Sequence, residues 1–413
     1  MKLKSNDREG KRRLNNPQKK EAPAGKRSAA RTAIFLLMFI VICLLAGLFV
    51  SEAVLRVAGL YPPESFEYRE GIPLFRYDPE VPIPASLKPG ATAKPFIYLD
   101  RKNNVRKYFN VNVNSLGLRG PETTMEKPSG TLRVITLGDS WTFGEGVDDD
   151  DTYSAGLEKL LNEMADPSLK YEVINCGYAT GRGPDESYLF LRNKGIRLQP
   201  DIVILGSYVN DTFDLRYNNW DRVDDNGLPL EITSEIIRIN EKGEYGYNYD
   251  NKLKLLLPRL MRHPMMRKLH IANLFQYKYL NFNLTRRKFD VKRFLGDPKD
   301  ESFNELWEKY YKVVFGMDAI CRANGARLMV LIIPLPSGRL AYLDDMGKKL
   351  SEKGILMLNL YPMVNGEEDY KEILFPCDGH WNEKGHARAA WVMYNYLLQN
   401  NWIKGGATER PVN

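Results

Sequence analysis

The sequence predicts an α/β fold, a parallel sheet with helices on both of its faces, for residues 131–403. Two observations lead to this prediction. From about Leu132 onward, short apolar segments alternate with longer helical patterns, which is typical of βαβ units. The chain of 413 residues, 43% of them hydrophobic and 11% aromatic, is also long and apolar enough for a large core.

The alternation predicts five strands and five helices in order along the chain. We expect the strands at 132–137, 171–175, 201–205, 327–333 and 355–360. We expect the helices at 153–164, 185–197, 301–324, 342–353 and 383–399. Because the strands are predicted to be parallel, polar residues that follow them should collect at one edge of the sheet, where open α/β folds bind their ligands.

The first 32 residues hold eleven Lys/Arg and three Asp/Glu, and we predict that they form a disordered basic tail in the cytoplasm. The whole chain has 59 basic and 52 acidic residues, so the remainder has 48 and 49, a net charge of −1. The basic character of the chain is therefore confined to its start, which excludes nucleic-acid binding as an interpretation of the bulk of the protein.

Residues 33–50 form an uncharged apolar run of eighteen residues, nearly enough to cross the hydrocarbon core of a bilayer. The run predicts a single transmembrane anchor at 33–55. The basic residues before it place the N-terminus in the cytoplasm and the rest of the chain outside. The alternative is a cleavable signal peptide with a weak small-residue site at Ser51 to Ala53, but the length of the run favours an anchor that is not cleaved.

Residues 56–130 are rich in Pro and Gly, and we predict an irregular segment that wraps the domain, with a few strands such as 108–113. A second irregular region, 212–300, is too long for a simple loop between a strand and a helix. From Lys252 to Arg293 it has twelve basic residues and one acidic residue, interleaved with Met, Leu and Phe. We predict a basic helical insertion. It is either a lid or surface that meets membrane phosphates, an anionic glycan or an acidic partner, or a solvated helical cap.

The four cysteines do not form a disulfide framework, and no spacing typical of metal ligands or cofactor binding occurs. Cys43 lies in the apolar run. A single bridge between Cys176 and Cys377 is one alternative, but isolated buried thiols are the favoured interpretation. The acidic run 148–151 is predicted to cap the helix that begins near Thr152 rather than to bind Ca²⁺.

Gly-Asp-Ser at 138–140 follows the first predicted strand, so the hydroxyl of Ser140 should lie at the edge of the sheet. A serine becomes a nucleophile when a base can accept its proton, and histidine is the usual base. Of the four histidines, His380 lies just before the last helix and has Asp378 two residues before it. We therefore predict a catalytic triad of Ser140, His380 and Asp378. His386, inside the helix, is expected to pack or cap.

An ester-cleaving site also needs donors for the developing oxyanion. The candidates are the N–H of Ser140, the N–H of Gly177 after the second strand, and the side-chain amide of Asn210 after the third. Arg119, in the segment 114–120, either lies near the cleft or belongs to a structural turn.

These blocks resemble the SGNH (GDSL-type) hydrolase superfamily. Residues 138–140 match its first block, Gly177 the second, residues 210–211 the third, and Asp378 with His380 the fifth. The resemblance implies a flavodoxin-like three-layer α/β/α fold over residues 131–403 and a serine nucleophile that forms an acyl-enzyme. It also implies the roles assigned above to Ser140, His380, Asp378, Gly177 and Asn210.

Three features depart from the pattern of the superfamily. Tyr208 replaces the usual Gly of the third block, which narrows the expected cleft. The second block, from Asn175 to Gly181, is one residue longer than its common forms. The fifth block is Asp-x-His-Trp instead of Asp-x-x-His. This variant is similar to the branch associated with O-acetylation of exported polysaccharides.

The sequence therefore predicts a membrane-anchored, extracytoplasmic serine esterase that acts on acyl esters, with O-acetyl esters of carbohydrate as the first candidates and without metal or cofactor. The alternatives are an O-acetyltransferase that modifies an exported polysaccharide and a non-catalytic subunit of a polysaccharide-modification complex. The predicted partners are the acylated carbohydrate or another acyl ester, the membrane and such an envelope complex, but not nucleic acid.

Overall fold

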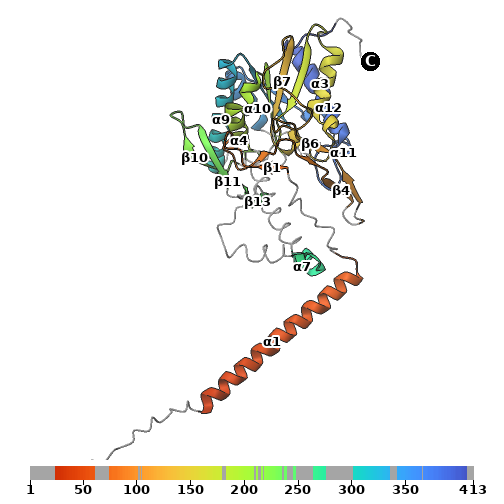
Figure 1. Ribbon diagram of the computed structural model, residues 1–413, viewed down its shortest axis with the longest axis vertical. Helices are drawn as coiled ribbons and strands as arrows, with labels where there is room; N and C mark the ends of the chain where they lie inside the picture. The colour runs from red at the N-terminus through yellow and green to blue at the C-terminus, as the bar shows by residue number, and fades with distance from the viewer. Residues whose placement is uncertain are drawn as a thin grey trace, which may run out of the picture.

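The computed structural model describes a sheet-centred domain with one long helix that extends away from it (Figure 1). The described residues are 24–60, 74–100, 103, 105–178, 183–208, 211–212, 215–216, 218–234, 237–239, 245–247, 264–275, 301–334, 342–364 and 366–406. The predicted oxyanion residue Asn210 lies outside them, as does most of the tail 1–32.

The central sheet has five parallel strands in the spatial order β15-β14-β9-β7-β8. The strands are β7 (Thr131–Leu137), β8 (Lys170–Asn175), β9 (Ile202–Ser207), β14 (Arg327–Ile332) and β15 (Leu356–Asn359). Numbered along the chain, this order is 2-1-3-4-5, which is the flavodoxin-like order. The predicted fold class is confirmed. The strand order reverses between β7 and β9, the place where open α/β sheets bind their ligands.

Helices cover both faces of the sheet (Figure 1). Alternate residues of the strands enter two separate hydrophobic clusters, as with Val134 and Ile135 of β7. The first cluster includes side chains of α4 (Pro184–Asn193), α9 (Asn304–Ala323) and α10 (Tyr342–Glu352), and the second those of α3 (Tyr153–Met164) and α12 (Glu383–Gln399). The short helical elements are α2 (Ser140–Phe143), η2 (Asp149–Asp151), η3 (Gly195–Leu198), η4 (Glu301–Phe303), η5 (Tyr361–Met363) and α11 (Glu367–Glu372).

The segment before the sheet forms three small antiparallel pairs, β1–β2, β3–β6 and β4–β5. The strands are β1 (Phe75–Arg76), β2 (Ser86–Leu87), β3 (Thr92–Ala93), β4 (Phe96–Asp100), β5 (Val105–Tyr108) and β6 (Val111–Asn112). The predicted strand at 108–113 is interrupted, because the N–H of Phe109 donates to Pro95 O and that of Asn110 to a carboxylate oxygen of Asp148. The segment shares a third cluster with Phe143, Tyr178 and Phe375, which belong to loops of the candidate site.

Helix α1 (Ala24–Val57) is the long helix that leaves the domain in Figure 1. Its residues 31–57 are long and apolar enough to cross a membrane, and none of this stretch is buried in the protein. The helix begins nine residues before the predicted anchor, inside the segment predicted to be a disordered tail. Ala, Lys and Arg at 24–31 are good helix formers, so the helical pattern extends into the basic segment.

The described part of the insertion is not uniformly helical. It begins with the hairpins β10 (Asn218–Val223) with β11 (Pro229–Ser234) and β12 (Ile237–Ile239) with β13 (Tyr245–Tyr247). Asp224 closes the first hairpin, since its Oδ1 accepts hydrogen bonds from the N–H groups of Asn226 and Leu228. Further along, α7 (Pro264–Arg267) and a helical turn at 270–275 are described. The prediction of a helical insertion is therefore wrong for its first part, where Asp and Gly residues favour a turn.

Candidate active site

Ser140 is the first residue of α2, and only Gly138 and Asp139 separate it from the end of β7. Asp139 caps this short helix, because its Oδ1 accepts a hydrogen bond of 3.0 Å from the N–H of Trp141. The serine thus stands at the carboxyl edge of the sheet, at the point where the strand order reverses. The position predicted for its hydroxyl is the position observed.

The three residues of the predicted triad lie together, although 240 positions separate Ser140 from His380. The Oγ of Ser140 is 2.8 Å from Nε2 of His380, and Nδ1 of the same ring is hydrogen-bonded to Oδ1 of Asp378. One imidazole therefore contacts a hydroxyl through one nitrogen and a carboxylate through the other, which is the arrangement that proton transfer from a serine requires.

A tight turn at 375–381 brings the carboxylate and the imidazole to the same side. The N–H of Phe375 donates to His380 O at 2.9 Å, and Gly379, between Asp378 and His380, has a left-handed backbone with φ of 88°. A residue with a side chain rarely adopts this conformation. The shortened Asp-x-His spacing depends on this glycine. The following Trp381 is fully buried and fixes the end of the turn in the core.

Asp378 also sets the protonation of His380. Burial of the ring by itself lowers the pKa, but the hydrogen bond and negative charge of Asp378 outweigh burial, so the pKa of His380 is raised above its ordinary value. Glu145 and Asp139 act in the same direction through their charges. The surroundings thus stabilise the imidazolium that forms when the histidine accepts a proton.

Arg119 holds the loop that follows α2. Its buried guanidinium donates to the carbonyl oxygens of Phe143 (2.6 Å), Gly144 (2.7 Å) and Val147 (2.7 Å), and it forms an ion pair of 2.7 Å with Asp149. Of the two interpretations of this arginine, the structure favours the structural one. Arg119 therefore links the wrapping segment to the loop after α2. A buried guanidinium needs several acceptors at once, and this loop supplies them.

The end of β8 supports the same loop from the other side. Asn175 Nδ2 donates to Thr142 O at 3.0 Å, and its Oδ1 accepts the N–H of Gly177 at 2.9 Å. A Cβ at Gly177 would stand 2.4 Å from the nitrogen of Phe143, so only glycine fits beside α2. The N–H of Gly177 predicted as an oxyanion donor is engaged by Asn175 in this structure. The role of Asn210 stays a prediction.

Trp141 lies close to the rings of both His380 and Tyr208. Trp141 lies 5.1 Å from the His380 ring and 4.7 Å from the ring of Tyr208, measured between centroids. Tyr208 is the residue that replaces the usual Gly of the third block, and burial raises its pKa well above the ordinary value. The close contact of this bulky side chain with Trp141 agrees with the expected narrowing of the site at this position. The sequence indicates the unusual Tyr208 but contains no signal that Trp141 would be its partner.

The N-terminus of α3 is capped by two side chains. Thr152 Oγ1 accepts from the N–H of Ala155 at 3.2 Å, and the buried His386 accepts from the N–H of Tyr153 at 3.1 Å through Nδ1. His386 therefore both packs and caps, as expected. The predicted cap by the acidic run is wrong. Asp149 of that run pairs with Arg119 instead, because a buried guanidinium is the stronger partner.

Because His386 is buried, we predict that the protein loses stability in acid. Burial is the main cause that lowers its pKa to about 3, from about 6.5 in an unfolded chain. Between these values the unfolded state binds the extra proton. The free energy of unfolding should therefore fall as the pH drops from 6.5 towards 3, by up to about 1.4 kcal/mol per pH unit from this group.

Chemical denaturation at a series of pH values measures this slope. In His386→Gln, which cannot titrate, the slope between pH 6 and 4 should be shallower by that amount, whatever the stability of the variant itself. An unchanged slope would show that other groups cause the acid lability.

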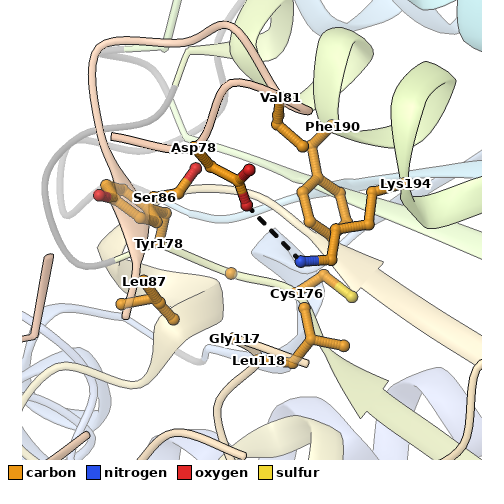
Figure 2. A pocket seen from close by; sticks show the side chains of 11 residues that line it. Asp78, Val81, Ser86, Leu87, Gly117, Leu118, Cys176, Tyr178, Phe190 and Lys194 are labelled. Atoms are coloured by element: carbon orange, nitrogen blue, oxygen red, sulfur yellow. Dashed lines mark ion pairs between the residues drawn. The ribbon is translucent and has the colours of Figure 1, made fainter. Parts of the chain in front are cut away.

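A small cavity of about 10 Å³, the size of one water molecule, lies behind the loop of Gly177. Figure 2 shows Lys194 directed across it to Asp78, with 3.8 Å between Nζ and Oδ2. Burial lowers the pKa of Lys194, and Asp78 partly opposes this effect. None of the three triad residues lines the cavity. Its ion pair joins the wrapping segment to the residues after α4, and the cavity is too small for a substrate.

Cys176 and Cys377 are not joined in a disulfide, so the bridge considered between them is absent. The thiol of Cys377 donates to the carbonyl oxygen of Leu99 at 3.2 Å. Cys321 is a free thiol in the core. The favoured interpretation of isolated thiols is correct, although Cys377 is only half-buried.

No family model matches the chain, and no curated protein matches it. Among solved structures, a G-D-S-L family protein from Desulfitobacterium hafniense is 12% identical, with a TM-score of 0.35, over 64% of this chain and 98% of its own. A two-domain esterase active on acetylated mannans is 16% identical, with a TM-score of 0.37, over 68% of this chain and 53% of its own. An acetylxylan esterase from Geobacillus stearothermophilus is 12% identical, with a TM-score of 0.34, over 65% of this chain and 93% of its own.

The assignment of the fold rests on the strand order of the sheet. The Gly-Asp-Ser segment follows β7, the first strand of the 2-1-3-4-5 order, and the Asp-x-His segment precedes the last helix, α12. These are the places that the SGNH blocks occupy in the resemblance described above. The chain therefore has a flavodoxin-like α/β/α fold, with the Gly-Asp-Ser and Asp-x-His segments at the positions given above.

Proposed function

We propose that the protein is a membrane-anchored serine esterase that cleaves short acyl esters, above all O-acetyl esters of carbohydrate. The observation that supports this function most directly is the position of His380. Its Nε2 is 2.8 Å from Ser140 Oγ while its Nδ1 is hydrogen-bonded to Asp378. A serine at the carboxyl edge of a sheet, with a base and an orienting carboxylate, is equipped for acyl transfer.

In the proposed reaction, Ser140 Oγ attacks the ester carbonyl while His380 Nε2 accepts the serine proton. Asp378 stabilises the resulting imidazolium at Nδ1. The tetrahedral intermediate then expels the alcohol, which takes the proton from His380, and the acyl group remains on Ser140 as an ester. A water molecule or a second hydroxyl, deprotonated by His380, attacks this ester and restores the free serine.

The oxyanion of the intermediate requires hydrogen-bond donors close to Ser140. The N–H of Ser140 lies in the first turn of α2, where N–H groups have no partner within a helix. We assign it as the first donor. The amide of Asn210 is the second in our proposal, and the N–H of Gly177 would join them only after release from Asn175.

The paired rings of Trp141 and Tyr208 favour a short acyl group. Trp141 lies 5.1 Å from the His380 ring and Tyr208 lies 4.7 Å from Trp141, so we expect the two rings to take up space that a longer chain would need. We expect p-nitrophenyl acetate to be cleaved with a higher kcat/KM than p-nitrophenyl octanoate. In Tyr208→Gly the ratio of the two values should shift towards octanoate by about tenfold or more, because removal of the ring opens the site.

A loss of stability in Tyr208→Gly does not affect that ratio, since both substrates are measured on the same protein. Trp391→Ala, a change at an exposed aromatic residue of α12, serves as the control and should leave the ratio unchanged. A wild-type preference for octanoate, or an unchanged ratio in Tyr208→Gly, would contradict the proposed acyl selectivity.

The molecule that receives the acyl group from Ser140 distinguishes an esterase, which uses water, from a transferase, which uses a second hydroxyl. The Asp-x-His-Trp block, similar to that of polysaccharide O-acetylation proteins, favours a carbohydrate at the site. We expect acetate to be released from acetylated oligosaccharides, and free acetate to exceed acetylated acceptor when unmodified oligosaccharides are added. Mass spectrometry of the acceptors measures this partition. Acetylated acceptor as the main product would replace the esterase by an O-acetyltransferase.

We also propose that α1 anchors the protein, with the N-terminus in the cytoplasm and the sheet domain outside. The length and apolarity of residues 31–57 and the excess of basic residues before them support this orientation. One reporter enzyme that works only outside the cytoplasm is fused after Asn413. We expect this fusion to show reporter activity. Activity of a reporter that works only in the cytoplasm would overturn the orientation.

A further inference from the structure

The end of α1 is joined to a remote segment of the insertion. Both carboxylate oxygens of Glu52 accept backbone N–H groups at the start of the helical turn 270–275, from His270 at 3.1 Å and from Ile271 at 2.9 Å. Arg56, which is paired with Glu52, donates to Lys268 O at 3.0 Å. These contacts join residues more than 200 positions apart. Figure 1 shows α7 of this segment beside the domain-facing end of α1.

The contacts set the depth of the segment relative to a membrane. Residues 31–57 are 27 in number, and at 1.5 Å per residue they span about 40 Å, the thickness of a bilayer with its headgroups. The eighteen apolar residues 33–50 span about 27 Å of this, close to the hydrocarbon core. Glu52 and Arg56 therefore stand in the headgroup layer, and the segment that they hold stands there with them.

The side chains of the joined region suit that layer. Val57, Met265 and Phe275 are 91%, 72% and 53% exposed, and Val54 and Leu60 are exposed as well. The exposed Lys268 lies among them. Apolar side chains with a basic residue between them are typical of segments that lie in the interface, where the apolar groups enter the acyl boundary and the cation meets lipid phosphate.

We propose that residues 264–275 form an interfacial segment, docked on α1 through Glu52 and Arg56, with Met265 and Phe275 inserted among lipids. The partner is the bilayer surface itself. The proposal rests on the anchoring role of α1, but not on the esterase activity. Its consequence is a second attachment of the catalytic domain to the membrane, because the segment belongs to the insertion between β9 and α9. A single helix alone would allow the domain to rotate above the bilayer.

Photo-cross-linking in the full chain tests the proposal. The photoreactive residue p-benzoylphenylalanine is placed singly at Phe275, Met265 or Val57, and at Val223 of the β10–β11 hairpin as an exposed control. Each protein is reconstituted into liposomes of phosphatidylcholine and phosphatidylglycerol and irradiated. Mass spectrometry then measures lipid adducts. We expect adducts at the first three positions and none at Val223.

The result at Val57 distinguishes failure of the interfacial segment from failure of the membrane anchor. Adducts at Val57 without adducts at Met265 and Phe275, or cross-links from those positions to a second copy of the chain, would overturn the interfacial segment alone. Absence of adducts at Val57 would overturn the anchor and the segment with it.

Glu52→Ala should abolish the adduct at Phe275 and keep that at Val57, while the neighbouring Ser51→Ala should change neither. Retention of the Phe275 adduct in Glu52→Ala would show that Glu52 does not hold the segment.

Discussion

Replacement of Ser140 by alanine is expected to lower kcat for acetyl ester cleavage by about 10⁴- to 10⁶-fold, because it removes the hydroxyl proposed to form the acyl-enzyme. The change removes the Oγ that lies 2.8 Å from His380 and leaves the backbone of α2 intact, since Asp139 caps that helix. Substrate binding should change little. Steady-state kinetics with p-nitrophenyl acetate measure the effect, and thermal unfolding of the same sample checks the fold.

Ser154→Ala is the matched control for Ser140→Ala. Ser154 is a buried serine of α3 whose hydroxyl contacts Thr136, away from His380. This control should retain wild-type kcat apart from the effect of lost stability. Equal rates for wild type and Ser140→Ala would exclude the nucleophile assignment and leave the non-catalytic subunit as the remaining alternative. Trapping of an acetylated Ser140 peptide by rapid acid quench would identify the intermediate directly.

Asp378→Asn is expected to lower kcat/KM by about 10⁴-fold at neutral pH, because the amide no longer stabilises the charged imidazole or holds the required tautomer. The pH dependence should change as well. In the wild type the neutral His380 acts as base, so activity should rise with pH through the raised pKa of that histidine. Without the carboxylate, burial dominates and moves that inflection to lower pH.

The shift of the inflection distinguishes a positioning role from damage to the fold. A variant that merely loses stability would show reduced activity with an unchanged inflection. Asp378→Glu keeps the negative charge on a longer side chain, so it should recover part of the activity and an inflection close to that of the wild type. An inflection in Asp378→Asn equal to that of the wild type would contradict the assignment of Asp378 as the partner of His380.

Much of the fold was predictable because the strands of a parallel sheet are buried on both faces and appear as continuous apolar runs. The runs at 132–137 and 171–175 correspond to β7 and β8 within a residue at each end, and α3 and α12 have their predicted bounds. The hairpin β10–β11 was not predicted. The basic amphipathic pattern of the later part of the insertion was extended to its first part, where Asp and Gly residues favour a turn between two strands.

The grouping of Ser140, His380 and Asp378 was predictable from sequence because few residues were available for each proposed role. Only four histidines occur, and one has an aspartate two residues before it. The supporting residues were harder to predict. Asn175 and Arg119 act by accepting or donating to backbone atoms of the loop after Ser140, and a sequence pattern records no such contacts. Only the folded chain brings their side chains to that loop.

The sequence by itself determined the α/β class, the serine with its histidine and aspartate, and an apolar segment of membrane length. These follow from local periodicity and from the scarcity of suitable residues. Tertiary structure decided the left-handed Gly379 that makes the short Asp-x-His spacing work, the pairing of Trp141 with Tyr208, and the docking of 264–275 on α1. Each of these depends on contacts between distant residues, whose geometry is set by packing of the whole domain and not by the local sequence.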